Sequence, residues 1–125
     1  MTAYELKNHI IDNYSASPEY LFAKYPSYAV FRHQSNKKWF AVIMRIPISK
    51  LGIMENREVS VVNLKCTPEA MDELWDSDGI FPAYHMNKRH WITVLLDGTV
   101  PTETVKKLLD VSFDATNVKI KKKQV

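Results

Sequence analysis

Residues 28–66 read YAVFRHQSNKKWFAVIMRIPISKLGIMENREVSVVNLKC, and this stretch decides the fold class. Residues 28–33 alternate with aromatic and β-branched content, and residues 39–46 are almost continuously apolar, as in a central strand. The polar residues 34–38 between them have the length of a hairpin connection. Residues 59–66 supply a third apolar run. Three strands in succession predict an antiparallel sheet.

A helix is predicted before these strands and another directly after them. Thr2 and Glu5 have the spacing of a capping box at the start of the first helix, and Ser15, Ser17 and Pro18 end it. Thr67 is the expected N-cap of the second helix. Three apolar positions at helical spacing form the predicted buried stripe of that helix: Met71, Leu74 and Trp75. The aromatic segment 20–25 receives no assignment.

The remaining residues predict two more strands and a last helix. Residues 83–86 are expected to form a short strand, residues 87–90 a turn, and residues 91–97 a longer strand that ends at a strong turn signal, Asp97-Gly98. The last helix starts near Pro101 and carries apolar residues at helical spacing. The order α-β-β-β-α-β-β-α predicts a two-layer α+β sandwich with one antiparallel sheet. We expect a single domain over residues 1–118 and a basic tail over residues 119–125.

Charge gives little support to a nucleic-acid function for the folded part. The chain has 125 residues and a net charge of +3. Four lysines lie in the tail, and removing them from the net charge leaves −1 for residues 1–118. A terminal lysine run is typical of a solvated chain end.

Composition also limits the compartment and the kinds of site. Cys66 is the one cysteine, so the chain forms no internal disulfide and no metal site built on several thiolates. The sequence has no run of about 20 apolar residues that would cross a bilayer, and the charged N-terminus does not resemble a signal peptide. We therefore expect a cytoplasmic protein without membrane contact.

The second half of the chain resembles the MmcQ/YjbR family. The specific block is PAYHMNKRHWITVLLDGTVP, residues 82–101. Leu64-Lys65, Pro68-Glu69 and Ser112-Phe113 also match, although the family often has Tyr in place of Phe113. The resemblance implies an α+β fold related to type III secretion chaperones, with helices on one face of the sheet. Family members are commonly described as DNA-binding through a double-wing arrangement of hairpins, and no catalytic residue set is attached to the family.

Two hairpin tips carry the candidate binding residues. The turn expected after residue 86 would form one basic wing that contacts phosphates, and the hairpin at residues 34–38 would form a second wing next to an aromatic ring suited to base stacking. The candidate nucleic-acid or ligand-binding residues are His85, Asn87, Lys88, Arg89, His90, Trp91, Lys37, Lys38 and Trp39. The competing interpretation is structural: Asn and Lys are ordinary turn residues, the histidines cap backbone groups, and Trp91 packs in the core.

Other classes of site find less support. His85 and His90 have a spacing that suits neither a helix face nor a strand face, so no metal or other cofactor is expected. Cys66 precedes a helix without an identifiable base nearby, which favours a packing role. We therefore predict a non-catalytic binding module with DNA as the partner that the resemblance implies. The alternative is a protein- or small-molecule-binding module, either a monomer or a weak homodimer.

Overall fold

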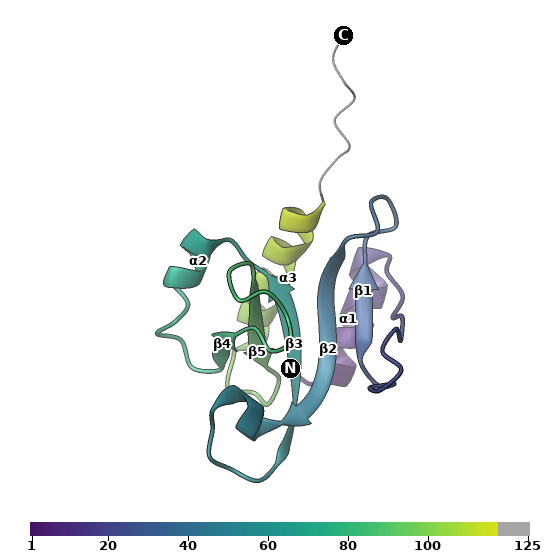
Figure 1. The fold of residues 1–125 in the computed structure, drawn as a ribbon. Coiled ribbons are helices and arrows are strands. Elements are labelled where there is room, and N and C mark those ends of the chain that lie inside the picture. The colour runs from purple at the N-terminus through teal and green to yellow at the C-terminus, as the bar shows by residue number, and fades with distance from the viewer. Residues whose placement is uncertain (118–125) are drawn as a thin grey trace.

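A computed structural model describes residues 1–117, and its elements follow the predicted order (Figure 1). The five strands form one sheet in the order β1-β2-β3-β5-β4, and every neighbouring pair is antiparallel. The predicted α+β class is confirmed, whereas the predicted domain end at residue 118 and the tail 119–125 lie outside the described residues. The elements are α1 (Ala3–Tyr14), β1 (Ala29–Arg32), β2 (Trp39–Pro47), the 3-10 helix η1 (Ile48–Leu51), β3 (Glu58–Lys65), α2 (Pro68–Asp72), β4 (Ile80–Pro82), β5 (Trp91–Leu95) and α3 (Thr102–Thr116).

Local hydrogen bonds set the helix ends where the sequence predicts them. The Thr2 hydroxyl accepts from the Glu5 backbone N–H at 3.1 Å, and the Thr2 N–H donates to the Glu5 carboxylate at 2.8 Å. These bonds satisfy donors that the helix itself leaves free, and they lower the pKa of Glu5. Ser15 ends α1 in the left-handed conformation. Thr67 caps α2 by accepting from the Ala70 N–H at 3.3 Å.

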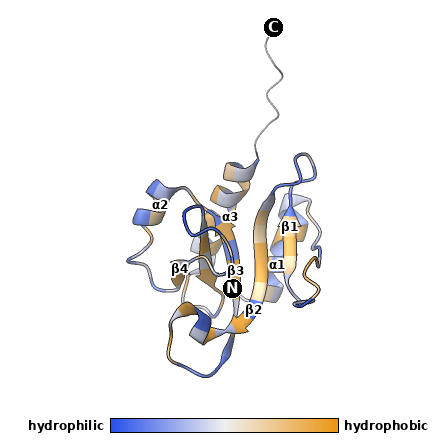
Figure 2. Ribbon diagram, viewed as in Figure 1, coloured by the Kyte–Doolittle hydropathy of each residue, from blue (hydrophilic) through white to orange (hydrophobic). Residues whose placement is uncertain are grey.

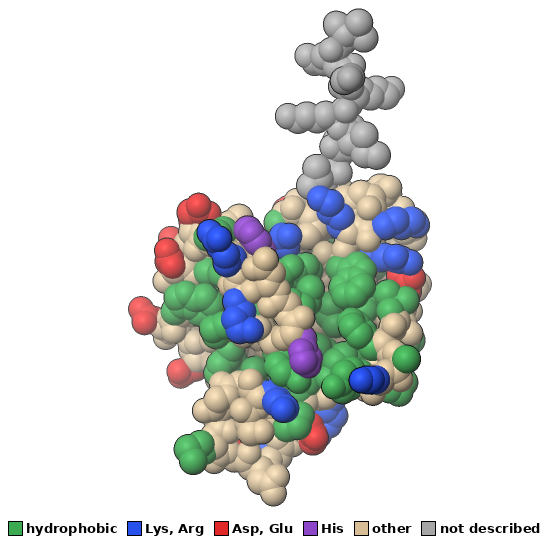
Figure 3. Space-filling model, in the orientation of Figure 1, with side chains coloured by type: hydrophobic (Ala, Val, Ile, Leu, Met, Phe, Trp, Pro, Cys, Tyr) green, Lys and Arg blue, Asp and Glu red, His purple; other side chains and the backbone are tan. Residues whose placement is uncertain are grey.

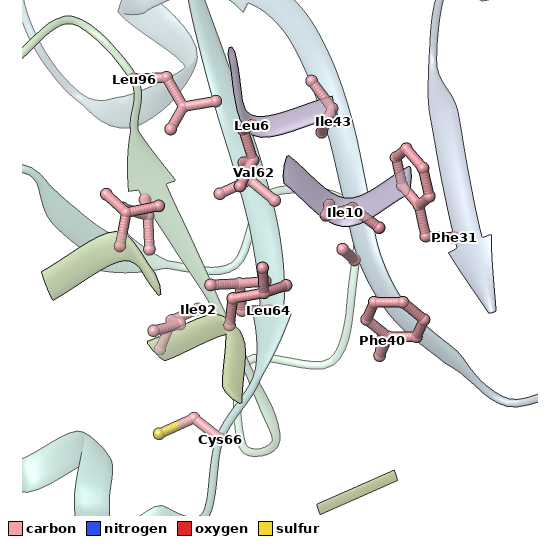
Figure 4. Packing of buried hydrophobic residues seen from close by; sticks show 14 of the residues in the cluster. Leu6, Ile10, Phe31, Phe40, Ile43, Val62, Leu64, Cys66, Ile92 and Leu96 are labelled. Atoms are coloured by element: carbon pink, nitrogen blue, oxygen red, sulfur yellow. The ribbon is translucent and has the colours of Figure 1, made fainter. Parts of the chain in front are cut away.

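One face of the sheet packs against α1 and α3, which lie behind it in Figure 1. Figure 2 shows the matching hydrophobic stretches along β1, β2 and β3. The close-up in Figure 4 shows α1 side chains meeting strand side chains, and Cys66 lies in the same cluster. Burial raises the pKa of its thiol, in agreement with the predicted packing role. The large members of this core are Leu6, Ile10, Phe31, Phe40, Ile43, Val62, Leu64, Ile92, Leu96 and Leu109.

Helix α3 is joined to the sheet by a buried hydroxyl. Ser112 Oγ donates to the Phe40 carbonyl at 2.6 Å and accepts from the Lys65 N–H at 2.8 Å. It therefore bridges the ends of β2 and β3. Near it, His33 Nε2 lies 2.8 Å from the Thr116 hydroxyl, and burial lowers the pKa of this histidine. These hydrogen bonds fasten the C-terminal end of α3 to the sheet and to His33.

Within residues 1–117, no α-helix packs on the centre of the opposite face of the sheet. Its buried residues come from β1, β2, β3 and β5, and they are covered by hydrophobic side chains of three non-helical or short 3-10 segments: residues 20–28, 48–57 and 83–90. We call this the loop-covered face. In Figure 1 the 83–90 loop crosses in front of β3.

Two details differ from the sequence prediction. Helix α2 ends at Asp72, and the following residues turn by bonds such as Leu74 N–H to Met71 O at 2.8 Å. The helical spacing therefore stops before Trp75, which is 41% exposed and not buried as predicted. The predicted strand at residues 83–86 is also wrong, because the strand before the turn is β4 and it ends at Pro82, which has no N–H to donate.

Candidate functional site: an aromatic pocket on the loop-covered face

A buried polar pair fixes the 83–90 loop over the sheet. Asn63 on β3 and Thr93 on β5 are direct cross-strand partners, and both are fully buried. The Thr93 hydroxyl donates to Asn63 Oδ1 at 2.6 Å and accepts from the Tyr84 N–H at 2.9 Å. The Asn63 amide donates to the Tyr84 carbonyl at 2.8 Å. Both backbone polar groups of Tyr84 are thus bonded to sheet side chains, which holds the loop in place.

Aromatic residues of the 20–28 segment form the opposite wall. The backbone turns twice, with the Tyr25 N–H bonded to the Phe22 carbonyl at 3.0 Å and the Tyr28 N–H to the Tyr25 carbonyl at 3.0 Å. These turns place the Tyr25 and Tyr28 rings parallel, with centroids 4.6 Å apart and an interplanar angle of 9°. The Phe22 ring meets the Trp39 ring edge to face at 5.9 Å. Such offset and edge contacts are favourable aromatic geometries.

The two walls enclose a pocket of about 600 Å³. Strand β2 contributes its floor, and the mouth is open to solvent. The volume lies within the range of roughly 300–1,000 Å³ that is typical of small-molecule sites. The lining residues are Phe22, Lys24, Tyr25, Tyr28, Trp39, Val42, Met44, Asn63, Tyr84, His85, Met86 and Asn87.

The pocket is apolar in its walls and positive at its margin. Of the residues that the structure describes, Lys24 is the one charged residue that lines it, and no carboxylate does. Burial is the largest effect that raises the pKa of Tyr28 and of Tyr84, so both hydroxyls stay protonated at neutral pH. Figure 3 shows Lys, Arg and His side chains spread around a green apolar area on this face.

The structure brings together three of the residues predicted as a site. Trp39, His85 and Asn87 line the pocket. His85 has a positive φ of 61°. This backbone conformation is unusual for a residue other than glycine and often marks a functional loop. It also explains why residues 83–86 do not continue as a strand.

The other predicted residues lie outside the pocket. Lys37 and Lys38 are exposed on the β1–β2 hairpin, and Lys88, Arg89 and His90 are exposed on the turn before β5. Trp91 is buried, with Lys65 Nζ 5.6 Å from its ring centroid, as the structural interpretation of this residue expected. The predicted tip cluster is therefore divided, with its first part facing the pocket and its basic part facing solvent.

Sequence reasoning missed most of the pocket wall. Phe22, Tyr25 and Tyr28 belong to the aromatic segment that received no assignment, and no local pattern predicts what they contact. Asn63 did carry a signal, because an amide in the middle of an apolar strand must find buried partners. Those partners lie on β5 and in the 83–90 loop.

Within residues 1–117, no group of three or more His, Cys, Asp or Glu side chains is arranged to hold a metal ion. None of the helices in this range has the length and apolar character needed to cross a membrane.

Comparison with known proteins assigns the chain to a family. The sequence model of the YjbR family matches residues 13–115, which is most of the chain. The chain belongs to the YjbR family. The uncharacterised protein YyaQ of Bacillus subtilis is 41% identical over 116 residues, covering 93% of this chain and 98% of YyaQ. The uncharacterised protein YjbR of Escherichia coli is 39% identical over 61 residues, covering 48% of this chain and 50% of YjbR.

Solved structures show the same YjbR-like fold. A crystal structure of a Pseudomonas syringae protein matches with a TM-score of 0.91 and 42% identity, covering 94% of this chain and 100% of that chain. A crystal structure of a Deinococcus radiodurans protein matches with a TM-score of 0.73 and 28% identity, covering 98% of this chain and 83% of that chain. The resemblance drawn from the sequence is thus confirmed for family and fold. Because YyaQ and YjbR are both described as uncharacterised, these relatives indicate no activity for this chain.

Proposed function

We propose that this protein is a non-catalytic binding module that holds a small molecule in the pocket on its loop-covered face. The observation that carries this proposal is the preformed state of the pocket. Hydrogen bonds from Asn63 and Thr93 fix one wall, and stacked tyrosines form the other. A site whose walls are ordered before binding loses less conformational entropy when a ligand enters.

Tryptophan signals provide a direct test. Trp39 lines the pocket, Trp75 is exposed elsewhere and Trp91 is buried. In ¹H–¹⁵N spectra of the protein, small-molecule fragments that enter the pocket should shift the Trp39 indole N–H and leave that of Trp75 in place. Trp39→Ala should then weaken binding of each such fragment by about tenfold or more, since a large aromatic contact is lost.

Trp75→Ala is the matched control, because it removes the same side chain from an exposed position outside the pocket. It should leave the affinity within about twofold. If a broad fragment set never shifts Trp39, or if both substitutions weaken binding equally, the pocket is not the binding site.

Nucleic acid is the second candidate, and the positions of the basic pairs favour it. Lys38 directly precedes the pocket residue Trp39, and Lys88 directly follows the pocket residue Asn87. Among residues 1–117, Lys37, Lys38, Lys88 and Arg89 make no ion pair. Two unpaired basic tips on either side of an aromatic surface would suit a single strand, with phosphates on the cations and a base on the rings.

Changing Lys88 and Arg89 together to Ala tests this candidate. Binding of labelled single-stranded and duplex DNA, followed by fluorescence anisotropy across a salt series, should weaken, and the salt slope on duplex should fall by about two. The control changes Lys106 and Lys107 to Ala, which removes the same charge from α3 behind the sheet. Equal losses in the two proteins would show that only net charge matters. Binding that disappears in a chain ending at Val118 would place it in the tail.

A further inference from the structure

We propose that the pocket selects a planar aromatic ring that carries an anionic group. This inference rests on the proposed function, since it names the class of ligand for the same pocket. Three features of the lining carry it: flat aromatic walls, a positive charge without a carboxylate, and polar groups with free hydrogen-bonding capacity.

The walls favour a flat ring over an aliphatic ligand. Tyr25 stacks in parallel on the buried Tyr28, lines the pocket and is 43% exposed. A ligand ring can extend this stack, and an edge contact with Trp39 would add to it. Aromatic pairs of this kind contribute about 0.5–1.5 kcal/mol beyond the area that they bury.

Charge selects the sign of the ligand. Aromatic cages that bind ammonium groups exploit the negative faces of the rings, but here Lys24 lines the pocket and no carboxylate of the described residues does, although the Glu58 carboxylate acts on the Tyr28 hydroxyl from outside the lining. Lys24 makes no ion pair within residues 1–117. Lys38 and Lys88, next to lining residues in the chain, add to the positive field. The positive margin therefore attracts an anionic ligand and repels a cationic one.

Two side chains at the mouth can orient a polar ring edge. Asn87 Oδ1 accepts from the Arg89 N–H at 2.8 Å, and across the described chain its amide N–H groups make no hydrogen bond. The His85 imidazole lies against the Tyr84 ring, with centroids 3.9 Å apart, and it too makes no hydrogen bond within that range. A few polar groups in a mainly apolar pocket are what fixes a small ligand's orientation.

The test compares three ligands that share one aromatic ring system and differ in charge. The probes are 2-naphthoate, 2-naphthylmethanol and 2-naphthylmethylammonium, titrated against the intact protein while the Trp39 indole N–H is observed. We expect the anion to bind at least about tenfold more tightly than the neutral alcohol, and the cation most weakly. Inorganic phosphate, an anion without a ring, should not compete with naphthoate at similar concentration.

A matched pair of lysine substitutions locates the charge effect. Lys24→Gln should weaken naphthoate binding by about fivefold or more and leave the alcohol within about twofold. Lys50→Gln removes the same charge from η1, outside the pocket lining, and should change neither. Both substitutions lie at exposed positions, so folding is expected to survive.

The outcomes separate the two proposals. If the alcohol or the ammonium binds as tightly as naphthoate, or if phosphate alone competes, the ligand class is wrong while the pocket remains a binding site. If neither these probes nor the broad fragment set shifts Trp39, both proposals are wrong.

Discussion

Thr93→Val is expected to lower the free energy of unfolding by about 2–5 kcal/mol and to release the loop that closes the pocket. Valine keeps the shape of threonine but has no hydroxyl. The Tyr84 N–H then has no acceptor, and Asn63 Oδ1 has no donor. Each buried polar group left without a partner costs about 1–3 kcal/mol. Because Thr93 is fully buried between β3 and β4, water does not replace the hydroxyl readily.

The measurement combines urea denaturation with amide hydrogen exchange. Unfolding midpoints give the loss of stability, provided that the denaturant dependence is unchanged. Exchange at the Tyr84 N–H should speed up more than exchange along β2, because the loop opens without unfolding the sheet.

Two control substitutions test whether the lost hydroxyl causes this result. Thr93→Ser retains the hydroxyl and should preserve protection of the Tyr84 N–H, although loss of a buried methyl costs about 1 kcal/mol. Thr104→Val makes the same chemical change on α3, where the hydroxyl makes no hydrogen bond within the described residues, and should stay within about 0.5 kcal/mol of the parent. If Thr93→Val is as mild as Thr104→Val, the polar pair does not hold the loop.

The strands and helices were predictable because their signals are local. Thr2 and Glu5 are close enough in sequence to define a helix start. Ile92 and Val94 show which side of β5 faces the helices, because side chains alternate along a strand. The errors arose where a local pattern is ambiguous. Residues 83–86 alternate like a strand, but the Tyr84 N–H is bonded to a side chain and not to a neighbouring strand.

The pocket was not predictable for a different reason. Its walls come from the 20–28 segment and the 83–90 loop, which are about 60 residues apart in the sequence and lie together only in the folded chain. Nothing in the aromatic segment alone specifies that Tyr25 will stack on Tyr28 beside Trp39. Trp39, His85 and Asn87 were among the candidate binding residues because they are rings or polar groups near turns, and all three line the pocket. It assigned them to exposed tips, since a turn residue is ordinarily solvated.

Gly79→Ala is the second change with a large expected effect, and it tests how tightly β4 is seated. Gly79 has a φ of +84°, which side-chain-bearing residues adopt at a cost of roughly 1–2 kcal/mol. An added Cβ would also lie 2.7 Å from Val100 Cγ2 and 3.2 Å from Thr99 Cγ2. Val100 is buried in the core cluster and has little room to move, so overpacking adds about 1–3 kcal/mol. The expected loss of unfolding free energy is therefore about 2–5 kcal/mol.

Gly98→Ala separates the two contributions. Gly98 also has a positive φ, of 93°, but apart from its two chain neighbours no described residue has a heavy atom within 4 Å of the position of an added Cβ. Its substitution should cost only the conformational part, about 1–2 kcal/mol. The difference between the two unfolding midpoints therefore measures the contact with Val100, and equal midpoints would show that Val100 moves aside.

Gly79 O also accepts from the Leu95 N–H at 2.8 Å, and β4 leads directly into the 83–90 loop. A displaced Gly79 should consequently reduce fragment binding at Trp39 even below the melting temperature, whereas Gly98→Ala should leave binding unchanged.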